Sequence, residues 1–399
     1  MTEVAEAEAL ILRHVPRLGS RREPLADCTD RVLAEDVTAE RDQPPFDRVT
    51  MDGIAIAGRD WEAGVRTFEI VGTQAAGAPP LALAAPAHCV EVMTGAMLPR
   101  GADTVIPVER LARNGHTATV DTRASVAARQ YVHPRGSDQR KGAVLLAAGA
   151  RLGPPEVAVL ASAGRATVSV AELPRVAVVS TGDELVDVDE PLAEYQIRSS
   201  NDRAIEASLT RAKLARVTRS RLRDDAATLR TALARLDAEA DVLVLSGGVS
   251  MGQFDLVPGV LAELGAKLVF HRVKQRPGKP IWFGTSSRGK PIFALPGNPV
   301  STLVCTTRYL LPALRAAAGL ATPPPELVAL AAPAEAPPEL TYFLPVKLAW
   351  SAAGAALATP CPTNTSGDFA ALAGTDGFVE LPARRSEYPA GAVVRLFRW

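Results

Sequence analysis

The sequence predicts a multidomain protein with a doubly wound α/β domain and further β-rich domains. Its 399 residues exceed the length of one typical domain, which is about 100–200 residues. From Pro174 to Ala321, continuous apolar segments alternate with helix-like segments, which is typical of a mostly parallel sheet covered on both faces. On both sides of this region, short alternating segments bounded by Gly, Pro and Asn are typical of β structure.

Composition narrows the class of protein. Lys plus Arg and Asp plus Glu each number 44, so a net charge of zero argues against a protein that neutralises nucleic-acid phosphates. No apolar run reaches the roughly 18 residues of a membrane span, and the acidic N-terminus is unlike a secretory signal. Cys28, Cys89, Cys305 and Cys361 are too scattered for a disulfide framework or a zinc motif. We therefore expect a cytoplasmic enzyme or binding protein.

The first 173 residues predict a β-rich segment flanked by segments with helix-like and strand-like patterns. Residues 3–17 have the apolar spacing of an amphipathic helix, and residues 141–173 contain a helix-like and then a strand-like segment. The short alternating runs between Ile54 and Val132 predict a β-rich inserted domain over residues 46–139.

The remaining residues predict an α/β domain over residues 174–321 and a C-terminal β domain over residues 326–399. In the first, buried strands are expected at RVAVVST, DVLVLS and PIFAL, and the last helix runs from Pro299 to about Ala318. The proline-rich residues 322–326 have the composition of a linker.

Three glycine-containing loops follow predicted strands, at residues 180–185, 246–255 and 295–301. In an open parallel sheet such loops gather outside the carboxyl ends of the strands, where successive N–H groups bind phosphate or another oxyanion. The alternative for any one loop is a tight turn before a capped helix, and Asn298 is expected to cap such a helix. The candidate binding residues are Ser180, Thr181, Gly182, Ser246, Gly247, Gly248, Ser250, Pro296, Gly297, Asn298, Pro299 and Ser301.

Charged side chains accompany these loops. Carboxylates beside a phosphate pocket suit a bridging Mg²⁺, which uses one or two carboxylates plus phosphate oxygens. Basic residues in HRVKQRPGKP (271–280) offer donors to an oxyanion. In both cases the alternative is a solvated charged surface. The carboxylates are Asp183, Glu184, Asp224, Asp225 and Asp255, and the basic residues are Arg272, Lys274, Arg276 and Lys279.

Seven motifs in this order resemble the molybdopterin molybdenumtransferase (MoeA) family, which is related to the E domain of gephyrin. They are MDG (51–53), MTGAMLPRGADTVIPVE (93–109), RGSD (135–138), STGDEL, SGGVSMGQFD, RPGKP and LPGNPVS. The resemblance implies a homodimer of four-domain subunits with a cleft shared between subunits, a MogA-like α/β domain and a barrel-like C-terminal domain. The same resemblance implies that residues 1–45 and 140–173 form one discontinuous mixed α/β domain for linking or dimerisation. It implies that molybdate and adenylated molybdopterin are substrates, that Mg²⁺ assists and that AMP is released. Handover to molybdoenzymes or an adenylyltransferase partner is also implied.

The resemblance also implies roles for individual residues. Asp52 and Thr94 are expected to handle protons, and Glu184 and Asp255 to bind the metal. Arg272, Arg276 and Ser301 are expected to bind molybdate, and Lys279 matches a basic residue inside the turn. The full catalytic set carried over from the motifs is Asp52, Thr94, Asp138, Glu184, Asp224 and Asp255. The chain departs from the family pattern where many relatives have Asn-Ser-Ala and this chain has Arg48, Val49 and Thr50.

Two other functions stay open from the sequence. The region 174–320 resembles stand-alone adenylyltransferases of molybdopterin, although the flanking domains then have no purpose. A pterin-binding scaffold without turnover is the other alternative. The residues do not distinguish molybdate from tungstate, because the two oxyanions are similar in size and charge.

Overall fold

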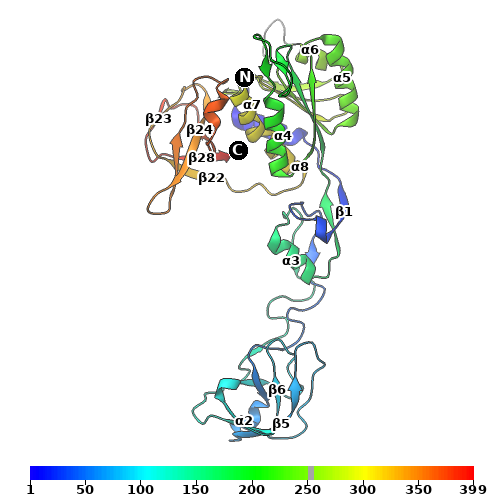
Figure 1. Cartoon of the computed structure of the whole chain (residues 1–399), viewed down its shortest axis with the longest axis vertical. Coiled ribbons are helices and arrows are strands. Elements are labelled where there is room, and N and C mark those ends of the chain that lie inside the picture. Colours follow the sequence, from blue (N-terminus) through cyan, green and yellow to red (C-terminus); the bar gives the residue numbers. More distant parts are fainter. Residues whose placement is uncertain (250–255) are drawn as a thin grey trace. The chain divides into compact units, whose positions relative to one another are not determined.

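The computed structural model describes residues 1–249 and 256–399 (Figure 1). These fall into two compact units. Unit 1 comprises Met1–Glu35, Ala148–Pro154 and Thr167–Trp399, and unit 2 comprises Asp36–Ala147 and Pro155–Ala166. The four domain boundaries expected from the sequence stay a prediction.

A six-stranded sheet forms the centre of unit 1. Its order is β16-β13-β17-β21-β20-β18, in which the first four strands pair in parallel, whereas β20 pairs antiparallel with both β21 and β18. The strands β17 and β21 are buried along their whole length, which explains their continuous apolar sequences. The bounds are β13 (Arg175–Thr181), β16 (Arg216–Leu222), β17 (Val242–Ser246), β18 (Lys267–His271), β20 (Trp282–Thr285) and β21 (Pro291–Leu295).

Helices cover both faces of this sheet, so the predicted doubly wound fold is confirmed (Figure 1). Val176 and Val178 of β13 pack with one helix layer, whereas Ala177 and Val179 face the other, because alternate side chains of a strand point to opposite faces. The first layer holds α1 (Val4–His14), α4 (Asn201–Ala212), α7 (Pro299–Cys305) and α8 (Leu311–Ala317). The second holds α5 (Ala226–Glu239) and α6 (Val257–Glu263).

Two helices differ in detail from their predictions. The N-terminal helix α1 ends at His14 rather than near residue 17, because Val15 is extended and precedes Pro16. The predicted helix after Pro299 is continuous but contains one π-helical segment, Thr306–Leu310, between α7 and α8. That segment places the side chains of Arg308 and Tyr309 in the protein interior.

The C-terminal part of unit 1 is a closed five-stranded barrel, which confirms the barrel-like domain. The strands close in the order β24-β25-β22-β28-β26 and back to β24. A short strand of the α/β region, β19 (Gln275–Arg276), pairs in parallel with β24 and so joins the basic turn to the barrel. The bounds are β22 (Glu326–Leu330), β24 (Thr341–Trp350), β25 (Ala356–Pro360), β26 (Gly377–Leu381) and β28 (Val393–Arg398).

Three two-stranded pairs complete unit 1. They are β1 (Ser20–Pro24) with β12 (Thr167–Ala171), β14 (Leu185–Val186) with β15 (Ile197–Arg198), and β23 (Ala334–Glu335) with β27 (Glu387–Tyr388).

Unit 2 is β-rich, as predicted, with a six-stranded sheet in the order β7-β4-β6-β5-β9-β8. Its strands are β4 (Gly53–Ile56), β5 (Thr67–Gln74), β6 (His88–Val92), β7 (Thr104–Pro107), β8 (Leu111–Asn114) and β9 (Thr117–Val120). The segment also contains a short helix, α2 (Gly58–Glu62), which was not among the elements predicted there. The smaller elements are β2 (Val37–Thr38) paired with β11 (Val144–Leu146), β3 (Arg48–Val49) paired with β10 (Val132–His133), and most of α3 (Pro154–Ser162).

No helix within residues 1–249 and 256–399 is both long enough and apolar enough to cross a membrane. All four cysteines are free thiols, with Cys28, Cys89 and Cys305 buried and Cys361 half-buried, as expected.

Candidate functional site

The described residues of the three glycine loops, 180–185, 246–249 and 295–301, lie at one edge of the unit 1 sheet, as predicted. The strands that precede them, β13, β17 and β21, are adjacent and parallel, so their carboxyl ends coincide. A Cβ added to Gly247 would lie 2.4 Å from the carbonyl oxygen of Thr181, and one added to Gly297 would lie 3.5 Å from the Cα of Gly247. The backbones therefore approach so closely that glycine is required at position 247, where φ is +98°.

Two hydroxyl groups at this edge are available to a ligand. Ser180 and Thr181 end β13 and are 1% and 4% exposed. Within the described part of the chain, neither hydroxyl oxygen has a hydrogen-bond partner. Buried polar groups in proteins are nearly always paired, so these two orphans fit a site that binds a polar ligand.

Asn201, which the sequence analysis did not select, joins two of the loops. Its side-chain amide, at the first residue of α4, donates to Ser246 Oγ (2.8 Å) and to the carbonyl oxygen of Gly297 (2.7 Å). The sequence signal for Asn201 was its position at the start of a helix, just after a short strand. This position does not indicate that its hydrogen-bond partners lie 45 and 96 residues further along the chain.

The expectation that Asn298 caps the last helix with its side chain is wrong. The helix α7 does begin at Pro299, but Asn298 makes no capping hydrogen bond and its amide donates to Ser366 Oγ (2.6 Å) in the barrel. Thr302 fixes the loop instead, because its hydroxyl donates to the carbonyl oxygens of Pro296 (2.5 Å) and Asn298 (3.2 Å).

A cavity of about 310 Å³ lies between the 295–301 loop, the basic turn and the barrel. Five of the predicted residues line it, namely Arg276, Lys279, Pro296, Asn298 and Ser301. Arg272 is not among the lining residues; its backbone, at φ +70°, pairs with Ile281. The barrel contributes Tyr342, Thr363, Thr365 and Ser366, which lie 63 or more residues beyond Lys279 and carried no recognised motif. Two cations and several hydroxyls around one cavity suit an oxyanion.

The predicted carboxylates have different surroundings. Glu184 is exposed and forms no ion pair within residues 1–249 and 256–399, so its oxygens are available to a cation. Asp183 pairs with Arg223 at 3.3 Å, and Asp225 caps α5 by accepting from the Thr228 N–H at 2.7 Å. Asp224 follows β16 at the same sheet edge.

Ser250 and Asp255 lie outside the described residues, so metal binding by Glu184 together with Asp255 stays a prediction. In the part of the chain that the structure does describe, no group of three or more His, Cys, Asp or Glu side chains is arranged to hold a metal ion.

Unit 2 brings Asp52 and Thr94 together. Asp52 Oδ1 accepts hydrogen bonds from the Thr94 backbone N–H (2.6 Å) and from its hydroxyl (2.7 Å). These two donors lower the pKa of Asp52 from its usual value, because they stabilise the carboxylate. Asp52 also lines a cavity of about 260 Å³, together with Glu91, Met93 and Arg113. An ionised carboxylate with a hydroxyl beside it is suited to accepting or relaying a proton.

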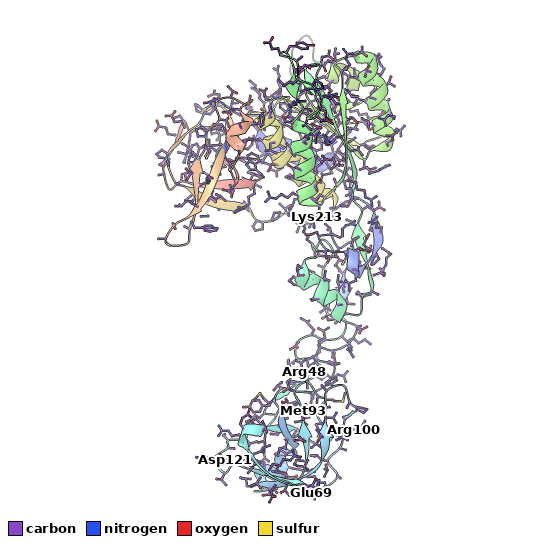
Figure 2. The ribbon with its side chains drawn as sticks, viewed as in Figure 1. Arg48, Glu69, Met93, Arg100, Asp121 and Lys213 are labelled. Carbon is purple, nitrogen blue, oxygen red and sulfur yellow. The ribbon has the colours of Figure 1, made fainter. Side chains whose placement is uncertain are left out.

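Asp138 lies in a second cluster of unit 2, with His133 and Arg48, the latter labelled in Figure 2. His133 Nε2 is 2.8 Å from Asp138 Oδ1, and His133 Nδ1 is 3.1 Å from Arg48 Nη2. A guanidinium group only donates, so Nδ1 must accept and the ring hydrogen sits on Nε2, where it is donated to Asp138. The departure from Asn at position 48 thus has a structural consequence, because Arg48 selects the His133 tautomer.

This assignment predicts the nitrogen chemical shifts of His133. Long-range proton–nitrogen spectra recorded at neutral pH should show that His133 has an unprotonated Nδ1 and a protonated Nε2. In the Arg48→Asn variant, both tautomers of His133 should be populated. The exposed His116 in the same sample is the internal reference. A protonated Nδ1 in the unmodified protein would contradict the assignment.

Two aspartates hold the segments that carry Asp52 and Asp138. Asp47 accepts from the Arg135 N–H (2.8 Å) and from Arg129 (2.9 Å). Asp42 accepts from the Lys141 N–H (3.0 Å) and from the Arg135 side chain (2.8 Å). The backbone donors first, then the arginines, lower the pKa of both carboxyls.

These lowered pKa values predict acid-sensitive stability. The ionised carboxylates stabilise the folded state above their unfolded pKa of about 3.9, and this contribution is lost as the pH falls through the lower folded values. The Tm should therefore fall on acidification below about pH 4, and the double variant D42N/D47N should show a smaller fall. Glu62→Gln, at an exposed position, is the matched control and should leave the slope unchanged. If the Tm of the double variant fell with pH as much as that of the unmodified protein, Asp42 and Asp47 would not be the cause of the acid sensitivity.

A doubly wound sheet with three converging glycine loops, and a cationic cavity beside them, defines an enzyme class that binds phosphorylated or other oxyanionic ligands. The chain matches family models for the MoeA N-terminal region (domain I and II) over residues 2–164, a probable molybdopterin binding domain over 177–316, and the MoeA C-terminal region (domain IV) over 328–398.

Whole-chain comparisons agree with these domain matches. The chain is 38% identical to a molybdopterin molybdenumtransferase of Synechocystis over 100% of both chains, and 31% identical to one of Bacillus subtilis over 93% of this chain and 88% of that protein. The crystal structure of a MoeA protein from Pyrococcus horikoshii superposes with a TM-score of 0.84 at 30% identity, covering 100% of this chain and 99% of that one. The chain therefore belongs to the molybdopterin molybdenumtransferase family, and it is a transferase of molybdenum cofactor biosynthesis.

Proposed function

We propose that this chain inserts molybdenum from molybdate into adenylated molybdopterin and releases AMP with the help of Mg²⁺. The observation that carries the proposal is the cavity in which Arg276 and Lys279 lie beside Ser301 and the rest of the 295–301 glycine loop. It offers cationic donors for a dianion next to N–H groups suited to phosphates, which are the two kinds of charge in these substrates.

Each group has a proposed task. The loops at Ser180–Gly182, Ser246–Gly248 and Pro296–Asn298 bind and orient the phosphates, and Glu184 supplies a carboxylate to a cation that neutralises them. Arg276, Lys279 and Ser301 bind molybdate. Orientation and charge neutralisation provide most of the catalysis in phosphoryl chemistry, so no covalent nucleophile is needed. Asp52 relays a proton as the two dithiolene thiols bind molybdenum, so that both thiol protons leave with one oxo group as water.

The test measures AMP release from adenylated molybdopterin with molybdate and Mg²⁺ present together or singly. Release only when both are present supports the proposal, and equal release without molybdate refutes the coupling. ATP consumption with free molybdopterin would instead support adenylyltransferase activity. Unchanged cofactor production by variants with alanine at Asp52 and Glu184 would support a scaffold.

Two further parts of the proposal concern assembly and compartment. A homodimer with a cleft completed by both subunits, and handover to molybdoenzymes or from an adenylyltransferase partner, stay predictions that sedimentation and pull-down measurements test. Four free thiols support a reducing compartment such as the cytoplasm.

A further inference from the structure

Beneath the basic turn lies a buried polar network that the proposed mechanism does not use. It consists of Gln275 on β19, and Cys305 and Tyr309 on the helix that follows the 295–301 loop. Their exposed fractions are 0%, 0% and 1%, respectively. Burying an amide, a thiol and a phenol costs folding free energy unless each of them is hydrogen-bonded. We therefore asked what their hydrogen bonds hold in place.

The direction of each hydrogen bond follows from the partners. Gln275 Nε2 donates to the carbonyl oxygen of Pro277 (3.1 Å), which can only accept, and it is 3.5 Å from Cys305 Sγ. The amide oxygen of Gln275 therefore faces Tyr309, whose hydroxyl must donate to it. Burial raises the pKa of Tyr309 well above its usual value and that of Cys305 to about 12, so both stay protonated donors at neutral pH.

These contacts fix the short turn that joins the two cationic residues of the cavity, Arg276 and Lys279. Pro277 and Gly278 separate Arg276 from Lys279, and Cys305 Sγ lies 3.9 Å from the carbonyl oxygen of Gly278. A Cβ on Gly278 would lie 2.6 Å from Gln275 Nε2 and 2.7 Å from Cys305 Sγ, so the turn rests directly on the network. From the other side, Arg276 pairs with Tyr342 of the barrel, and its guanidinium carbon is 5.7 Å from that ring.

We propose that Gln275, Tyr309 and Cys305 are positioning residues that set the placement of Arg276 and Lys279, and thereby the affinity for the tetrahedral oxyanion. This inference rests on the proposed function, in which that oxyanion is molybdate. The network does not touch the ligand itself. It therefore controls the KM for molybdate while leaving kcat and the KM for adenylated molybdopterin nearly unchanged.

The test uses Gln275→Met, Tyr309→Phe and the double variant in the full-length protein. Each should raise the KM for molybdate, and its dissociation constant in calorimetry, by about three- to tenfold, the effect of losing one buried hydrogen bond. The single variants leave a buried partner unpaired and should also lower the Tm. In the double variant both partners are apolar, so stability should recover while the molybdate affinity stays weak.

Tyr388→Phe is the matched control. Tyr388 is another buried tyrosine, 5% exposed, and its hydroxyl donates to the carbonyl oxygen of Pro382 in the barrel. Its loss should lower the Tm without changing the KM for molybdate. An equal rise of that KM in Tyr388→Phe, or an unchanged KM in all three network variants, would overturn the proposal.

The outcomes also separate this inference from the proposed function. A wild-type protein that binds molybdate without releasing AMP refutes the proposed function alone. Equal molybdate affinities in wild-type and network variants refute the positioning role alone. A wild-type protein that binds no molybdate refutes both.

Discussion

Asp52→Asn is expected to reduce the rate of AMP release by about 100- to 10,000-fold, the usual contribution of a positioned acid–base group. The amide has the shape of the carboxylate, and its oxygen still accepts from the Thr94 N–H and hydroxyl at 2.6 and 2.7 Å. Only the negative charge and the ability to take a proton are lost. The measurement is the initial rate at saturating molybdate and adenylated molybdopterin.

Thr94→Ser is the control for this pair, because it retains both donors to Asp52 and should keep nearly the full rate. Since the Thr94 donors lower the pKa of Asp52, the carboxylate is ionised throughout the neutral range. The acid limb that Asp52 gives to the rate profile should therefore lie below about pH 4. Full activity of the Asp52→Asn variant would show that Asp52 does not transfer a proton in the reaction.

The sheet and its loops could be predicted because their signals are local. A strand buried on both faces needs an uninterrupted apolar sequence, and β17 and β21 have one. Parallel strands then force the loops that follow them to the same edge, so the convergence of Thr181, Gly247 and Gly297 followed from strand order alone. Asp52 and Thr94 were both selected from motif resemblance, but their contact was not predicted, since nothing in their sequence spacing indicates one.

Residues that act through tertiary contacts could not be predicted. Asn201 and Ser366 each contact loops far away in the sequence, and polar residues at a helix start or in a barrel loop are usually solvated. Asn298 shows the opposite error, because the capping preference of asparagine is weaker here than a contact with the barrel. Arg48 was noted only as a departure, and its meaning depends on the antiparallel pairing of β3 with β10, which places it opposite His133.

Gly247→Ala is expected to lower the rate of AMP release by at least about 100-fold, because a displacement of about 1 Å at a reacting centre has that effect. The added Cβ would lie 2.4 Å from a backbone oxygen of Thr181, which cannot rotate away, and the residue has φ +98°. The loop must therefore move away from β13 or from Gly297. The free energy of unfolding should fall by about 1–3 kcal/mol, the cost of a residue held in a disfavoured conformation.

Gly289→Ala is the control that distinguishes two effects of Gly247→Ala, namely the strain of a positive φ and the clash of the added Cβ with a neighbouring loop. Gly289 has φ +76°, but a Cβ there would meet nothing within 4 Å. It precedes β21, at the opposite end of that strand from Gly297. This variant should lose about 1 kcal/mol of stability and keep its activity, as measured by denaturant unfolding and AMP release on the same samples. If Gly247→Ala released AMP as fast as Gly289→Ala, the contact between the loops would have no part in binding the phosphates, and the site would have to lie elsewhere on the chain.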